Sequence, residues 1–156
     1  MNFDVVLDLF RALEREEVEY VLVGGVALNV LGLTRATQDI DLFLRPEPGN
    51  VDRAKAALRS VFSDPSIEEI SAEDLAGGYP TIRYVPPEES FVIDLLGRLG
   101  EAFRYEDLEA EVQWVEGIRV KVATPKTLYK MKKDTLRPID RADAEALRRR
   151  FKLEED

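Results

Sequence analysis

Three aspartates have the type and the spacing to bind a divalent metal ion. Asp39 and Asp41 are two residues apart in segment 39–44, whose alternating pattern predicts a strand. Residues two apart on a strand leave the same face, so both carboxylates can converge on one point. Hard oxygen ligands of this kind suit Mg²⁺ or Mn²⁺. An exposed strand face is the alternative, because Asp-x-Asp is frequent in acidic proteins.

The third aspartate, Asp94, lies in the otherwise apolar run 91–96, which is typical of a strand buried on both faces. A buried carboxylate costs several kcal/mol unless it is paired or bound to a metal. An ion pair with an arginine or lysine is therefore one explanation. A third metal ligand is the other, and it requires that this strand lie beside the strand of Asp39 and Asp41.

Gly24 and Gly25 end the β-rich run 20–23 and lead into the apolar segment 26–31, which predicts a strand turning directly into a buried helix. The free amides and the dipole at the start of a helix favour phosphate, so this turn is a candidate phosphate site. A tight turn without a ligand explains the glycines equally well. The glycine patterns of dinucleotide folds and of P-loops are absent from the sequence.

The composition excludes several other chemistries. The 156 residues include no histidine and no cysteine, which rules out imidazole bases, thiolate nucleophiles, disulfides and zinc sites made of these residues. The net charge is −9, yet residues 119–152 hold 12 basic and 4 acidic residues. This C-terminal part is a candidate surface for nucleotide or RNA phosphate, and solvated helix faces are the alternative.

The elements that must position these residues follow from hydrophobic periodicity and turn residues. The pattern predicts helices over 3–17, 26–31 and 51–62, and strands over 20–23, 39–44, 81–85, 91–96, 112–115 and 118–122. It also predicts a weak strand and a loop in 64–79, and a short helix in 101–110. Thr124 and Pro125 open a C-terminal helical segment, 124–151, which Pro138 divides. We therefore expect an α/β (α+β) fold, with a short mixed sheet flanked by helices in one domain over 1–156.

Several stretches together resemble the DNA polymerase β-like nucleotidyltransferase superfamily, and within it the minimal nucleotidyltransferase and abortive-infection (AbiE-type) toxin branch. They are Val23-Gly24-Gly25-Val26-Ala27-Leu28, Thr34-Arg35-Ala36-Thr37-Gln38-Asp39-Ile40-Asp41-Leu42, Ile93-Asp94-Leu95, and Lys132 followed by Arg137-Pro138-Ile139-Asp140 and Asp143. The resemblance covers residues 20–45, 91–96 and 122–147, and it implies a polymerase β-like nucleotidyltransferase core.

This resemblance implies a metal-dependent transfer of NMP from an NTP to a hydroxyl of RNA, such as a tRNA 3′ end, or of protein. It implies that Mg²⁺ (or Mn²⁺) is bound by the three carboxylates, and that phosphates are held by the glycine pair. The catalytic and metal-binding residues implied are Asp39, Asp41 and Asp94; the nucleotide-binding residues are Gly24, Gly25, Arg35, Thr37 and Lys132, supported by Arg137 and Asp140.

The same resemblance implies a component of a toxin–antitoxin pair, with a cognate toxin or antitoxin as partner. The alternative is a non-catalytic nucleotide- or partner-binding, antitoxin-like protein on the same fold. We expect a cytoplasmic location, because the first residues are acidic where a signal peptide is basic. No membrane span is expected, since the longest uncharged run, 20–34, has 15 residues and is interrupted by glycines.

Overall fold

The computed structural model describes residues 1–78 and 80–154. Its elements in chain order are α1 (Phe3–Arg15), β1 (Tyr20–Val23), α2 (Gly24–Val30), β2 (Asp39–Leu44), α3 (Pro48–Val61), the 3₁₀ helix η1 (Pro65–Glu69), α4 (Ala72–Ala76), β3 (Thr81–Tyr84), β4 (Val92–Leu96), β5 (Arg98–Leu99), β6 (Phe103–Arg104), the 3₁₀ helix η2 (Tyr105–Asp107), β7 (Ala110–Val115), β8 (Ile118–Ala123), α5 (Pro125–Lys132) and α6 (Pro138–Phe151). No helix in these two ranges is both long and apolar enough to cross a bilayer.

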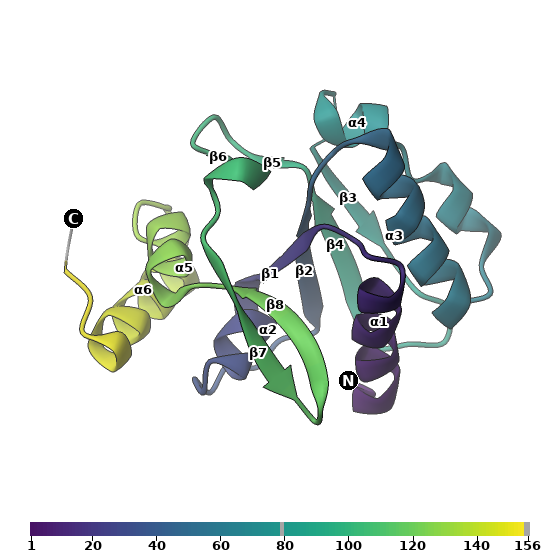
Figure 1. The fold of residues 1–156 in the computed structure, drawn as a ribbon. Coiled ribbons are helices and arrows are strands. Elements are labelled where there is room, and N and C mark those ends of the chain that lie inside the picture. The colour runs from purple at the N-terminus through teal and green to yellow at the C-terminus, as the bar shows by residue number, and fades with distance from the viewer. Residues whose placement is uncertain (79, 155–156) are drawn as a thin grey trace.

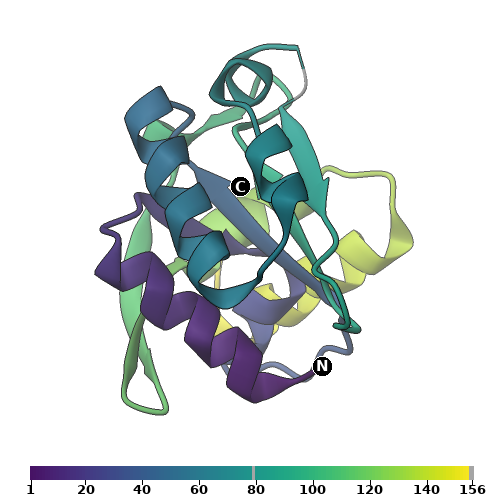
Figure 2. The same ribbon diagram turned by 90° about the vertical axis from the view of Figure 1, so that its right-hand side faces the viewer.

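Six strands form one mixed sheet in the order β3-β4-β2-β1-β8-β7 (Figure 1). The pairs β2/β4 and β1/β8 are parallel, and the other three pairs are antiparallel. Helices α1 and α3 lie in front of this sheet in Figure 2, and α5 and α6 lie behind it. The expected fold, a short mixed sheet flanked by helices, is therefore confirmed.

The core forms where the apolar faces of α1 and α3 cover the central strands. In β2, Ile40, Leu42 and Leu44 are completely buried on one face, which leaves Asp39 and Asp41 on the other. Strand β1 is buried at all four of its positions. The two edge strands of the sheet are β3 and β7. Strand β3 carries Arg83, and β7 carries Trp114, which is 69% exposed.

Two segments differ from the sequence prediction. The weak strand and loop predicted in 64–79 are wrong, because η1 and α4 occupy this segment; its last residue, Tyr79, is outside the described residues. The side chains of Asp64 and Ser71 accept hydrogen bonds from the amides of Ser66 and Asp74 and so begin the two helices. The helix predicted over 101–110 is also wrong, since only the short η2 forms there, between β6 and β7.

Asn50 fixes the end of the β1–β2 pair that lies away from the glycine turn. Its buried side chain accepts from the backbone N–H of Glu19 at 2.7 Å and donates to the carbonyls of Glu19 and Arg45, both at 2.9 Å. Glu19 precedes β1 and Arg45 follows β2, so one amide joins both strands. The register that results places Val23 opposite Asp41 and brings the glycine turn to the acidic face.

Replacing Asn50 with Ala should lower the free energy of unfolding by about 2–4 kcal/mol, because the N–H of Glu19 and the carbonyl of Arg45 lose their side-chain partner. Urea unfolding followed by circular dichroism measures the change. The control is Asn29→Ala, since Asn29 is an exposed residue of α2 and its loss should cost less than about 0.5 kcal/mol. Equal losses in both variants would show that Asn50 does not join the strands.

Candidate active site

The pairing of β2 with β4 brings the three aspartates to one place. In this parallel ladder Asp41 lies opposite Asp94, and Asp39 lies opposite Val92. Paired residues on neighbouring strands share a face and lie about 5 Å apart. The requirement that Asp94 lie beside the strand of Asp39 and Asp41 is therefore met, and the three carboxylates form one acidic cluster.

Asp94 also has an arginine partner. Arg83 lies opposite Asp94 in the β3–β4 ladder, its Nε donates to Asp94 Oδ1 at 2.9 Å, and its Nη2 donates to Oδ2 at 3.2 Å. The same Nη2 is 3.9 Å from Asp39 Oδ2. Both explanations for the buried acid thus coincide, since Asp94 belongs to the acidic cluster and is also ion-paired.

The acidic cluster carries more negative charge than its surroundings balance. Burial, and then the charges of Asp94 and Asp39, raise the pKa of Asp41 from 3.8 to about 7. A cation placed among hard oxygen donors would relieve this repulsion, so the donor set fits a divalent metal ion. Across 1–78 and 80–154, however, no three acidic side chains stand close enough to hold an ion. Both oxygens of Asp94 are bonded to Arg83 instead.

The glycine pair allows the backbone to approach the acids. Gly24 has φ +75°, and a methyl group on it would overlap Asp41 Oδ2. A methyl group on Gly25 would lie 3.0 Å from Cβ of Thr37. The Thr37 hydroxyl in turn accepts from the N–H of Asp39 at 3.1 Å, at the start of β2. Gly24 therefore lies directly against the acidic cluster, and Thr37 connects Gly25 to the backbone of Asp39.

A second charged group, on α5 and α6, adjoins the acidic cluster. Lys132, only 9% exposed, donates to Asp143 Oδ2 at 2.9 Å and to Asp140 Oδ1 at 3.3 Å. Arg35 Nε donates to Asp143 Oδ1 at 3.1 Å and so ties the segment before β2 to α6. The charge of Lys132 lowers the pKa of Asp41, although less than the acids raise it, which places this lysine within electrostatic range of the acidic cluster.

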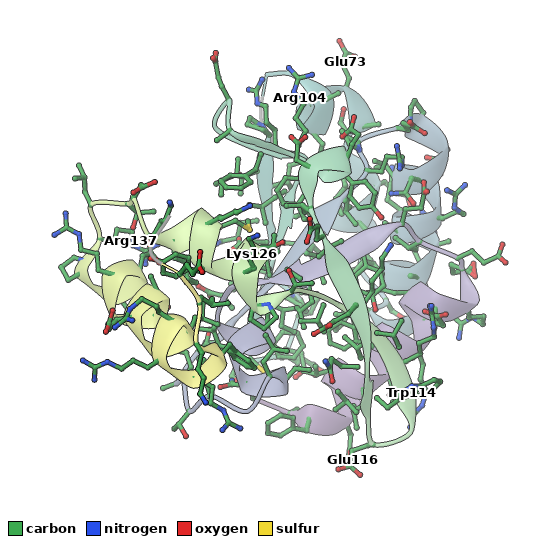
Figure 3. All side chains as sticks on the ribbon, turned by 60° about the vertical axis from the view of Figure 1, so that its left-hand side comes forward. Glu73, Arg104, Trp114, Glu116, Lys126 and Arg137 are labelled. Carbon is green, nitrogen blue, oxygen red and sulfur yellow. The ribbon has the colours of Figure 1, made fainter. Side chains whose placement is uncertain are left out.

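Two residues of this neighbourhood were not assigned a role from the sequence. Asp143 holds both Lys132 and Arg35, and its spacing of three residues from Asp140 on one helix is the signal that could have identified it. Arg83 gives no local signal, because only the strand register brings it to Asp94. Arg137, labelled in Figure 3, is exposed at the start of α6, and its Nε lies 3.8 Å from Asp140 Oδ2.

Residues 7–151 match the model of a protein family described as nucleotidyl transferase AbiEii toxin, type IV TA system. The fold is similar to that of a Thermotoga maritima protein described as a nucleotidyltransferase, with TM-score 0.55 and 14% identity over 96% of this chain and 92% of that chain. It is also similar to ANT(2″)-Ia in complex with adenylyl-2″-tobramycin, with TM-score 0.57 and 15% identity over 96% and 90%. At these identities the likeness shows the fold. No curated protein matches the chain.

Replacing Gly24 with Ala should lower the free energy of unfolding by about 2–4 kcal/mol, because a side chain at positive φ is strained and its methyl group meets Asp41. Gly32→Ala is the matched control, since Gly32 has φ +95° but its added methyl would meet only Arg150 Nη2, at 3.6 Å. That variant should lose about 1–2 kcal/mol. Similar losses in the two variants would argue against a close contact at Gly24.

A double-mutant cycle tests the same contact directly. In the Gly24→Ala, Asp41→Ala double variant the overlapping carboxylate is absent, so the loss should be smaller than the two single changes predict together. Urea unfolding of the four proteins at one pH gives the interaction energy. Strict additivity would mean that Gly24 and Asp41 do not touch.

The metal-free protein should lose stability as the pH rises from about 4 to about 7. In this range the folded state keeps a proton on Asp41, whose pKa is about 7, whereas the unfolded state, with a pKa near 3.8, releases it. Asp41→Asn removes this difference, so the variant should match the wild type near pH 4. At pH 8 it should be more stable by about 1–3 kcal/mol, a range that allows for solvent screening.

Urea unfolding in EDTA at the two pH values measures the effect. Asp52→Asn, which removes an exposed carboxylate from α3, is the control and should show no such dependence on pH. If Asp41→Asn changed stability equally at both pH values, titration of Asp41 would not be the cause.

Proposed function

The chain belongs to the AbiEii family of nucleotidyltransferase toxins, and from this premise we propose that it transfers NMP from an NTP to a hydroxyl of RNA, with release of pyrophosphate, using a divalent metal ion. Membership of this family makes the chain an enzyme, and it decides against the non-catalytic alternative. The observation that supports the proposed mechanism best is the shared face of Asp39, Asp41 and Asp94 beside the glycine turn.

We assign Asp39, Asp41 and Asp94 as the residues that hold Mg²⁺ or Mn²⁺. When bound, such an ion lowers the pKa of an attacking hydroxyl and offsets charge on the phosphates, which is chemistry that needs no histidine or cysteine. The acidic cluster itself has the wrong charge to receive a triphosphate. This repulsion is the reason that the neighbouring backbone amides and basic side chains matter to binding.

The phosphates of the NTP are assigned to the turn at Gly24 and Gly25. Helix α2 begins at Gly24 without a side-chain cap, so its first N–H groups have no partner from the preceding residue. Neither glycine has a side chain that would keep a phosphate away from these groups. Thr37 packs against Gly25 and bonds to the start of β2, so it holds the turn and the acids at a fixed separation.

Lys132 supplies positive charge beside the phosphates. Its ammonium is held in place by Asp140 and Asp143. Arg35 pairs with Asp143 and Arg137 lies beside Asp140, so three cations face two carboxylates and one positive charge remains for a triphosphate. Arg35, which is bonded to Asp143, extends this positive region to the segment before β2. In this assignment Asp143 is a positioning residue, because it acts through Lys132 and Arg35.

The acceptor favoured by the charge distribution is RNA rather than protein. Exposed basic side chains occur on α5 and α6, the helices that carry Lys132 and Asp143: Lys126, Lys130, Arg137, Arg141, Arg149 and Arg150. Exposed cations of this number attract the phosphate backbone of a nucleic acid. The family description also places the chain in a toxin–antitoxin system, so we propose an antitoxin as its cognate partner.

Replacing Asp39 with Asn should reduce NMP transfer at least about 100-fold, because the acidic cluster loses one of its metal-directed charges. The assay supplies each α-labelled NTP with Mg²⁺ and total RNA, and a parallel reaction supplies cell protein in place of RNA. Asp52→Asn is the control, and circular dichroism verifies that both variants fold. The Asp39 side chain is 47% exposed, so its replacement should leave the core intact.

Each outcome of this assay has a distinct meaning. Label on RNA in the wild-type reaction supports the proposal, whereas label on protein alone would replace RNA by protein as the acceptor. Full transfer by Asp39→Asn would refute the assignment of the acidic cluster. Binding of NTP by the wild type without any transfer would refute the proposed reaction.

A further inference from the structure

Arg83 is a cation of the chain that already touches the acidic cluster. Its guanidinium bonds both oxygens of Asp94 and reaches Asp39, so two of the three carboxylates are in contact with it. The partner side chains differ sharply in exposure, since that of Arg83 is 59% exposed and that of Asp94 only 12%. The arginine therefore covers the acid from the solvent side.

This arrangement sets a condition on metal binding. A metal ion bound to Asp94 would share its oxygens with Arg83, since each oxygen already accepts a hydrogen bond from the guanidinium. The guanidinium and the ion are also both positive, so they repel each other across the same carboxylate. A free metal ion therefore competes with Arg83 for Asp94 and supplies no new partner for the guanidinium.

The backbone at Arg83 is fixed while its side chain is free to leave. The next residue, Tyr84, is buried and its hydroxyl donates to Asp64 Oδ2 at 2.9 Å, which anchors the end of edge strand β3. In the part of the chain that the structure describes, the ion pairs of Arg83 are those with Asp94 and Asp39. A new anion on the solvent side could thus take over the guanidinium without a change in the sheet.

We propose that Arg83 is a displaceable counter-ion that excludes free divalent cations from the acidic cluster and yields to the metal–NTP complex, whose phosphate groups take over its guanidinium. This inference rests on the proposed function, because it takes the acidic cluster as the metal site. Guanidinium matches phosphate oxygens as well as it matches a carboxylate. Metal and nucleotide then strengthen each other's binding, and the coupling passes through one side chain.

The first test measures binding of Mn²⁺ alone to the full chain at pH 8, from the electron paramagnetic resonance signal of the free ion. Arg83→Gln should bind Mn²⁺ roughly tenfold more tightly than the wild type, because the competing charge is gone. The control is Arg119→Gln, which removes the same charge from β8, where Arg119 forms a 2.9 Å ion pair with Glu14 of α1. It should leave Mn²⁺ binding unchanged, and Asp41→Asn should abolish it.

The second test repeats the titration with non-hydrolysable analogues of the four NTPs. Beyond the binding of Mn²⁺ to the analogue itself, a bound analogue should raise the Mn²⁺ affinity of the wild type about tenfold or more. In Arg83→Gln this gain should be smaller, because only the direct contact between metal and phosphate remains. Arg83→Lys keeps the charge without the two-pronged hydrogen bonding, so its values should lie between the two. Thermal unfolding shows whether each variant folds. If Arg83→Gln does not fold, Arg83→Lys is compared with the wild type instead.

The results separate this inference from the function on which it rests. If Asp41→Asn abolishes Mn²⁺ binding but Arg83→Gln binds no more tightly than Arg119→Gln, the counter-ion role is overturned and the metal site stands. If Asp41→Asn binds Mn²⁺ as the wild type does, the metal site itself is wrong. Arg83→Gln could also bind Mn²⁺ more tightly and yet gain as much affinity from the nucleotide analogue as the wild type does. Arg83 would then still exclude free ions, but the proposal that phosphate takes over its guanidinium would be overturned.

Discussion

The parallel register between β2 and β4 is the constraint on which the candidate site depends. It sets Asp41 beside Asp94, and a slip of one residue would turn one of them into the apolar core between the sheet and the helices α1 and α3. The buried faces of both strands prevent such a slip, because it would expose residues such as Ile40 and bury an acid. The same apolar packing that stabilises the fold thus determines which charges meet.

Two nearby cations reduce the repulsion among the three carboxylates of the acidic cluster. One side of the acidic cluster faces Arg83, which is largely in solvent, and another faces Lys132, which is buried and shared with two aspartates. Neither cation neutralises Asp41 completely, so burial and repulsion still dominate at this residue. Groups held in an unfavourable charge state are typical of functional sites, where a ligand removes the penalty.

Much of this site could be predicted from the sequence because its signals are local. The alternation in 39–44, the acid in an apolar run and the paired glycines each lie within six residues, and the structure brings all of them together. Their roles as ligands stay predictions. Arg83 could not be found in this way, because its pairing with Asp94 depends on the antiparallel register of two strands, which no short segment encodes.

The errors in the secondary structure have a related cause. In 64–79 the acids and serines suggested a loop, but Asp64 and Ser71 act as helix caps, and caps and loops use the same residue types. In 101–110 the apolar spacing suggested a helix, whereas β5 and β6 pair through Arg98 and Arg104 around Gly100, which has φ +57°. The spacing of residues within one short segment does not reveal that the segment pairs with another strand, so the helix was predicted in error.

The order of the strands has one more consequence, for how the protein can be observed. The chain has one tryptophan, Trp114, which lies on the edge strand β7, and Arg83 and Asp94 lie on β3 and β4 at the opposite side of the sheet. Figure 3 shows Trp114 near the tip of the β7–β8 hairpin. Its intrinsic fluorescence is therefore a reporter of that hairpin and of unfolding. Trp114 also lines a cavity with Arg35 and Thr37, so its fluorescence should respond to a ligand that enters there as well.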